Sequence, residues 1–144
     1  MTTPKDLLKQ LLLFLGTAPT RPSKAELTKF LHDDVAWTFP IGAGRGVGGT
    51  HNGIDAVAKL LSAIFTKIYN SETFEYQFHG FFGDSEFAAA RYAVKAETAT
   101  GLKYENEYAL LVRVRDGRIA ELWEYVDTTH AKDQMYPSSP ENAT

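Results

Sequence analysis

The chain has 144 residues, of which 44% are apolar and 23% charged, a composition that suits one compact domain with its own core. Its net charge of −3, with lysines and arginines scattered along the sequence, excludes a basic surface for nucleic acid. The absence of cysteine excludes disulfides and thiolate chemistry and is typical of a cytoplasmic protein.

The first predicted element is a helix over residues 4–16. Its leucines follow helical spacing, and Asp6 and Lys9 interrupt the apolar run, so we expect an amphipathic helix rather than a signal peptide. The run is also far shorter than the roughly 20 apolar residues of a membrane span. We therefore expect a soluble protein with no membrane partner.

Two further helices and one strand are predicted next. Ser23 and Glu26 have the spacing of a capping box, which indicates the start of a second short helix. Residues 35–39 alternate as a strand does, and Pro40 ends them. Apolar residues at helical spacing over residues 54–66 predict the third helix.

The segment between the first strand and the third helix, residues 41–53, is rich in glycine. It lacks the glycine spacing of a dinucleotide-binding loop and the Gly-Lys-Ser/Thr ending of a P-loop. A nucleotide site is therefore not expected there. We predict a mobile flap over the mouth of a pocket.

From residue 72 onward, apolar and polar residues alternate with the period of a strand. Turn residues at 83–85, 98–101 and 115–117 divide this region into four strands, which we expect to form an antiparallel meander. Helices on one face of a curled antiparallel sheet make an α+β domain shaped like a cone, with a cavity between the two layers.

This domain is expected to be single and to cover residues 1–132. The remaining residues, 133–144, contain Pro137 and Pro140 and end in a polar run. Such a composition is typical of a frayed tail.

The predicted strand registers bring a candidate site together on the inner face of the sheet. A three-residue turn ending at Gly117 sets Tyr108 opposite Glu124. A four-residue turn at residues 98–101 sets Arg91 opposite Tyr108. The odd-numbered residues from 103 to 115 are mostly charged, which places the even-numbered ones inside.

Two alternatives stay open at this point. A two-residue turn would instead bring Trp123, Tyr125 and Asp127 inside. If Glu124 and Arg91 do face inward, they form either an acid/base site, with a carboxyl pKa tuned by burial, or a buried ion pair that only holds the sheet together.

A small hydrophobic molecule is the expected occupant of the cavity. Its predicted binding residues are inward-facing aromatic, aliphatic and amide side chains: Trp37, Phe39, Phe78, Tyr104, Asn106, Leu110, Leu122 and Val126. Trp37 and Phe39 are equally well explained as core aromatics. Asp127 has the position of a helix N-cap. The four histidines lack ligand spacing, so no metal site is expected.

Several segments resemble the SnoaL-like polyketide cyclases and their relatives in the nuclear transport factor 2-like superfamily. They are residues 33–37, 52–57, 104–108, 116–119 and 124–127. The resemblance implies the cone-shaped fold, a cofactor-independent acid/base reaction and a homodimer through the outer face of the sheet. In that interface, Glu105, Glu107 and Trp123 are the expected contacts.

The resemblance also narrows the chemistry. Where ketosteroid isomerases have two acids, this chain has Phe39 and Leu110. It matches the arginine and last-strand acid of limonene-epoxide-hydrolase-like enzymes with Arg91 and Glu124, but Ala93 replaces the middle aspartate.

The expected catalytic residues are therefore Glu124, Arg91, Tyr108 and Asp127, with either Glu124 or Asp127 as the acid/base. The expected function is that of an isomerase, cyclase or hydratase/hydrolase. The alternative is a ligand-binding or dimerisation module without turnover.

Overall fold

A computed structural model describes residues 2–44 and 46–137. The helices are α1 (Pro4–Leu15), α2 (Lys24–Leu27), α3 (Ile54–Ala63) and α4 (Thr128–Met135). The strands are β1 (Leu31–Phe39), β2 (Gly49–Asn52), β3 (Glu75–Gly83), β4 (Phe87–Glu97), β5 (Lys103–Arg115) and β6 (Arg118–Val126). Short helical segments η1 (Ile41–Ala43), η2 (Ile64–Ile68) and η3 (Ser71–Thr73) join them; η2 has the wider π-helical turn.

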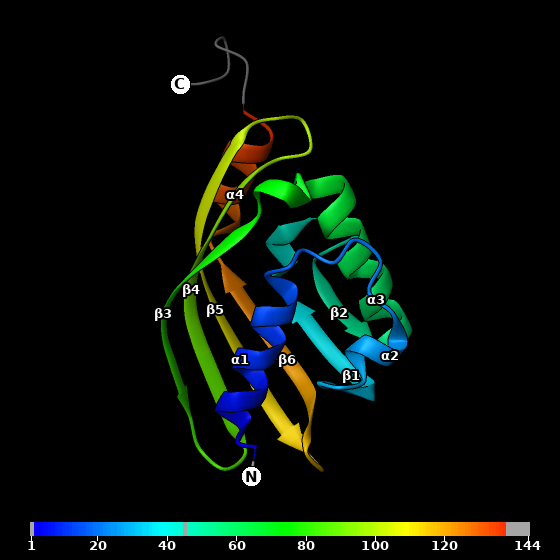
Figure 1. Cartoon of the computed structure of the whole chain (residues 1–144). Helices are drawn as coiled ribbons and strands as arrows, with labels where there is room; N and C mark the ends of the chain where they lie inside the picture. Colours follow the sequence, from blue (N-terminus) through cyan, green and yellow to red (C-terminus); the bar gives the residue numbers. More distant parts are fainter. Residues whose placement is uncertain (1, 45, 138–144) are drawn as a thin grey trace.

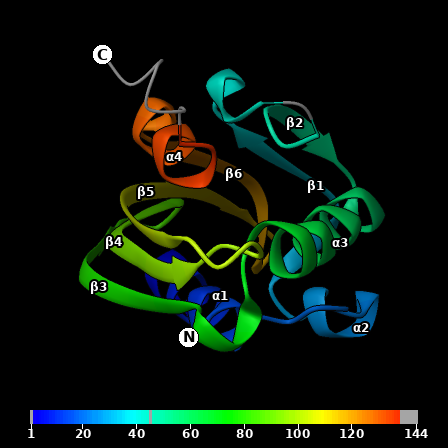
Figure 2. The same cartoon turned by 90° about the horizontal axis from the view of Figure 1, so that it is seen from above.

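The sheet has six strands in the order β2-β1-β6-β5-β4-β3, and only the β1–β6 pair is parallel. Figure 1 shows α1, α2 and α3 on one side of this sheet, and Figure 2 shows the sheet curling around them. The predicted α+β class and the curled, open sheet are confirmed.

Helix α1 supplies much of the core. Thr3 and Asp6 form a reciprocal capping box at its start, and Gly16 follows its last residue. Leu8, Leu11 and Leu12 are fully buried against the inner face of the sheet, whereas Leu13 lies on the outer side of the helix and is 56% exposed. Within the described residues, no helix is long and apolar enough to cross a membrane.

The structure adds one strand that the sequence did not predict and gives the last helix a greater length than a short turn after Asp127. Strand β2 lies inside the glycine-rich segment expected to be a flap, where it pairs with the end of β1 and a Thr38–Thr50 hydroxyl hydrogen bond of 2.9 Å joins the two. Helix α4 runs to Met135, so residues 133–135 of the predicted tail are helical. Residues 138–144 of that tail lie outside the described part of the chain.

The predicted register between β4 and β5 is wrong by one residue. Glu97 pairs with Lys103 rather than Leu102, because the loop between Thr98 and Leu102 has three residues, with Gly101 at a φ of +88°. A shift of one residue exchanges the two faces of a strand. Tyr92 therefore stands opposite Tyr108 on the inner face, and Arg91 points outward.

The turn between β5 and β6 has two residues, not three. Asp116 and Gly117 both have positive φ, which fits a tight hairpin, and Arg115 pairs with Arg118. A bulge at Ala120 then adds one residue to β6. The shorter turn and the bulge each exchange the two faces of β6, so together they leave Glu124 facing inward as predicted. Its partner on β5 is Leu110 instead of Tyr108.

A second bulge lies at His79 in β3, where the register shifts between Phe78 and Gly80. Beyond it, Phe81 packs on the core side, and Phe82 is 59% exposed. Strict alternation along this strand would have placed Phe82 on the same face as Phe78, and the bulge places it on the opposite face.

Candidate functional site

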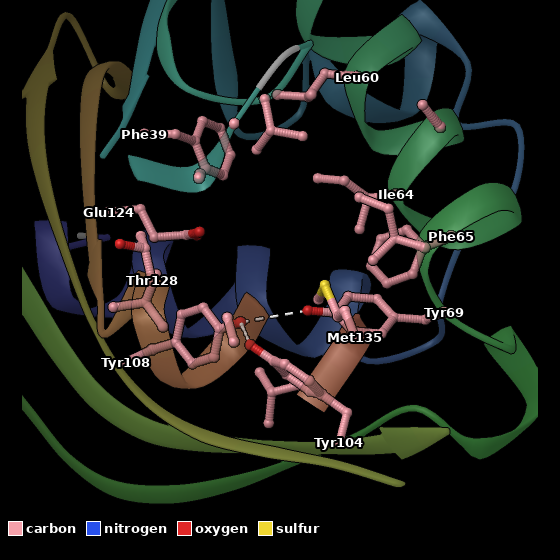
Figure 3. Close-up of a pocket in the computed structure, with 18 of the residues that line it drawn as sticks. Phe39, Leu60, Ile64, Phe65, Tyr69, Tyr104, Tyr108, Glu124, Thr128 and Met135 are labelled. Atoms are coloured by element: carbon pink, nitrogen blue, oxygen red, sulfur yellow. Dashed lines mark hydrogen bonds between the residues drawn. The ribbon is translucent and has the colours of Figure 1, made fainter. Parts of the chain in front are cut away.

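A cavity of about 810 Å³ opens between the inner face of the sheet, the α3–η2 segment and α4. Most of its wall is aromatic or aliphatic. Figure 3 shows the side chains of Phe39, Leu60, Ile64 and Phe65 around the open space, with one carboxyl and a group of phenols facing it. The volume suits a drug-sized organic ligand.

Glu124 is the acidic group of the cavity interior. It comes from the inner face of β6, and its carboxyl points into the open space (Figure 3). The residue is half-buried, and the exposed part of its side chain faces the cavity rather than the outer surface. Burial raises the pKa of its carboxyl to about 8. No hydrogen bond to this side chain occurs within residues 2–44 and 46–137. The group is therefore protonated through much of the neutral range and free to meet a ligand.

Three phenols form a hydrogen-bonded cluster in the same cavity. The hydroxyl of Tyr108 lies 2.5 Å from that of Tyr104 and 3.3 Å from that of Tyr69 (Figure 3). The three hydroxyls carry three protons, and their two mutual hydrogen bonds use two of them. One proton remains, which the cluster can donate to a ligand oxygen.

The cluster stays neutral at physiological pH. Burial raises the pKa of Tyr69 and of Tyr108 well above the usual phenol value, and raises that of Tyr104 less strongly. The ring of Tyr92 stacks on that of Tyr108, with centroids 5.5 Å apart and planes 3° from parallel. This packing fixes the orientation of the central phenol.

A further donor lies in the wall formed by β1. The indole Nε1–H of Trp37 is buried and finds no acceptor among the described residues. An unpaired buried donor costs about 1–3 kcal/mol. Trp37 also stacks on Phe39, with ring centroids 5.5 Å apart.

Segment η1 with the loop after it and α4 border the mouth of the cavity. Gly42 lies so close to Thr128 that a Cβ at position 42 would clash with the Thr128 hydroxyl. His130 Nε2 forms a hydrogen bond of 3.1 Å with the backbone O of Glu105, and the backbone N–H of Glu105 donates one of 3.2 Å to Gln134 Oε1. These two bonds hold α4 to β5 beyond the end of β6. The contact between Gly42 and Thr128 thus holds η1 against α4, and the hydrogen bonds to Glu105 hold α4 against the sheet.

The structure brings half of the predicted site residues together. Those that line the cavity are Trp37, Phe39, Tyr104, Tyr108, Glu124 and Val126. Four others do not line it. Leu110 and Leu122 are fully buried in the core, Phe78 packs against other aromatic rings, and Asn106 donates its amide N–H to Asp127 O at 3.0 Å.

Two predicted catalytic residues lie elsewhere. Arg91 is exposed on the outer face because of the β4–β5 register, so neither an acid/base pair nor a buried ion pair with Glu124 can form. Asp127 is exposed and caps α4 by accepting a hydrogen bond from His130 N at 3.0 Å. The structural role predicted for Asp127 is the one it has.

Sequence reasoning missed Tyr69 and Tyr92. Tyr92 was missed because of the register error. Tyr69 continues the helical spacing of Leu61 and Phe65, four residues at a time, beyond the point where the third helix was expected to end. That pattern could have placed it in the cavity.

No group of three or more His, Asp or Glu side chains in the described residues is arranged to hold a metal ion. Among the described residues, the polar groups of the cavity interior are one carboxyl, several phenols and the hydroxyl of Thr128. These groups suit proton transfer and hydrogen bonding to an organic oxygen atom.

Solved structures share this fold. A nuclear transport factor 2-like protein from Burkholderia thailandensis E264 superposes with a TM-score of 0.76 at 17% identity, over 95% of this chain and 100% of that one. A protein from Rhodopseudomonas palustris, named as a candidate isomerase, gives 0.74 at 21% identity, over 89% and 94%. A candidate SnoaL-like polyketide cyclase from Jannaschia sp. CCS1 gives 0.75 at 8% identity, over 96% of each chain.

No curated protein matches the chain significantly. The model of the SnoaL-like domain matches residues 18–122, which is well over half of the sequence and includes most of the sheet and α3. The fold, the large apolar cavity and this match agree. The chain belongs to the SnoaL-like domain family, whose members bind small molecules.

Proposed function

We propose that the protein is a cofactor-independent acid/base enzyme that isomerises or cyclises a small, largely apolar carbonyl compound through its enolate. One observation carries the proposal. A carboxyl with a pKa of about 8 faces an otherwise apolar cavity that also holds a phenol cluster with a proton to donate. Catalytic groups near neutral pKa in a cleft are typical of proton-transfer sites.

The chemistry assigns one role to each group. Ionised Glu124 takes a proton from the carbon next to the substrate carbonyl, and the C–H electron pair moves to form the enolate. The phenol cluster donates a hydrogen bond to the enolate oxygen, where negative charge develops. In isomerisation, an enolate conjugated with a C=C bond takes the proton back from Glu124 at the far end of that bond. In cyclisation, the enolate carbon attacks a second carbonyl carbon of the same molecule, the electron pair of that C=O bond moves to its oxygen, and this oxygen takes the proton from Glu124, which returns to its ionised form.

The related structures support this class of reaction by their names, one an isomerase and one a polyketide cyclase. At identities of 21% and 8%, these structures show only that the fold is shared. We infer the reaction from the groups that line the cavity of this chain. Epoxide hydrolysis by an arginine-held acid loses its support, because Arg91 lies on the outer face.

A direct test measures carbon–hydrogen exchange. A panel of cyclic ketones and 1,3-diketones is incubated with the protein in D₂O, and deuterium uptake at the carbons next to the carbonyl is followed by mass spectrometry. We expect the protein to accelerate uptake for ketones that bind. Ketones that bind without any acceleration would show a binding module instead, which is the alternative function.

Removing the central phenol is expected to slow the reaction without abolishing it. In Tyr108→Phe, we expect the exchange rate to fall roughly 10- to 100-fold, less than for a sole oxyanion donor, because Tyr104 and Tyr69 remain. Tyr125→Phe is the matched control, since Tyr125 is 56% exposed on the outer face. Equal rates in both variants would remove the phenol cluster from the mechanism.

We also propose that two copies pair through the outer face of the sheet. Phe82 and Leu111 lie on this face, 59% and 38% exposed, in the same row as Ala89 and Trp123. An exposed apolar row of this kind is typical of an interface. Sedimentation equilibrium would test it, with a monomer at high concentration as the contrary result.

A further inference from the structure

We propose that the ligand is an amphiphile whose anionic group rests at the mouth of the cavity between Lys67 and Lys132. This inference deepens the proposed function and rests on it for the identity of the occupied site. It adds the charge of the substrate and its direction of entry.

The interior of the cavity cannot hold an anion of the ligand by ion pairing. Among the described lining residues, the interior groups are apolar side chains, neutral phenols, the Thr128 hydroxyl and Glu124, and none of them carries a positive charge. Arg91, which was expected to supply a positive charge there, is outside. Burying an unpaired charge is costly. An anionic group must therefore lie at the mouth, while the apolar body fills the interior.

The mouth offers two lysines from separate elements. Lys67 belongs to η2, which follows α3, and Lys132 belongs to α4; both line the cavity and are exposed. Figure 2 shows α3 and α4 on opposite sides of this end of the molecule. The ion pairs formed within residues 2–44 and 46–137 involve other cations, so neither ammonium group is neutralised by one.

The charged side chains at the mouth of the cavity are mostly positive, in contrast to the whole chain. Asp133 also lines the cavity beside Lys132, which leaves the lysines in excess over the single acid at this border. The whole chain has a net charge of −3. A positive border on an acidic protein selects an anion at the mouth and attracts it during entry.

Two fluorescent probes that differ by one charge test this inference. 8-Anilino-1-naphthalenesulfonate and N-phenyl-1-naphthylamine share an apolar body, but only the first carries a sulfonate. In Lys67→Gln/Lys132→Gln, we expect sulfonate binding to weaken about three- to tenfold, since ion pairs that are exposed to solvent are individually weak. Binding of the neutral probe should stay unchanged, and the two probes should compete in the wild type.

Lys59→Gln/Lys103→Gln is the control, because it removes the same charge from two exposed lysines that do not line the cavity. Equal sulfonate binding in both double variants would overturn the inference, and so would failure of both probes to bind. The lysine effect does not depend on turnover. If it is found while no ketone exchanges deuterium, the anion site stands and the enzyme proposal falls.

Discussion

Glu124→Gln is expected to lower the rate of enzyme-catalysed carbon–hydrogen exchange by about 10²- to 10⁴-fold, the usual contribution of a positioned acid/base group. Glutamine has nearly the same shape as glutamate and can still form hydrogen bonds, but it cannot take up or release the proton. The cavity should therefore keep its ligand while the reaction stops. Exchange rates and probe binding, measured on the same preparation, separate the two effects.

Asp127→Asn is the matched control for this prediction. Asparagine caps a helix about as well as aspartate, so α4 should remain in place and the rate should stay within about twofold. Arg91→Gln should behave in the same way, since Arg91 is exposed on the outer face. If Asp127→Asn were inactive and Glu124→Gln fully active, the acid/base role would belong to Asp127, contrary to our assignment.

The second large effect is a dependence of stability on pH that comes from Glu124. Its pKa is about 8 in the folded protein, against 4.5 for the same group in a model compound. Between these values the folded state keeps a proton that the unfolded state has released. The contribution of Glu124 to the free energy of unfolding should therefore fall by about 1.4 kcal/mol per pH unit as the pH rises from 4.5 to 8, and level off above 8.

The measurement compares urea unfolding of the wild type and Glu124→Gln across this range. Other titrating groups are common to both proteins and cancel in the difference. We expect Glu124→Gln to gain stability relative to the wild type as the pH rises, by up to about 5 kcal/mol over the full window. A constant difference would mean that Glu124 ionises in the folded protein as it does in the unfolded one.

Much of the fold follows from local signals in the sequence. The capping box at Ser23 and the helical leucine spacing place the first helices. The Asp-Gly pair at residues 116–117 places the last hairpin. These signals are short in range, so no tertiary information is needed to use them.

The strand registers are harder to predict, because a register depends on loop length to a single residue. An error of one residue in the pairing across the loop between β4 and β5, with Glu97 opposite Lys103 instead of Leu102, exchanged Arg91 for Tyr92 on the inner face. Bulges at His79 and Ala120 have no signal that alternation alone reveals. The inward position of Glu124 was predicted correctly only because two deviations cancel.

The cavity itself was predictable as a class of site but not in its composition. Trp37, Phe39 and Tyr104 were expected from alternation and do line it. The phenol cluster depends on Tyr69, which reaches the site from the end of η2 across from β5. Contacts between elements far apart in sequence are set by packing, which local patterns do not encode.

The central claim is that Glu124 is a neutral acid at pH 7 that titrates near pH 8. Infrared difference spectroscopy of the wild type against Glu124→Gln measures this directly through the carbonyl stretch of a protonated carboxyl. We expect that band at pH 6 and pH 7, with its midpoint of loss near pH 8. A band already lost at pH 6, with the carboxylate signal in its place, would contradict the account.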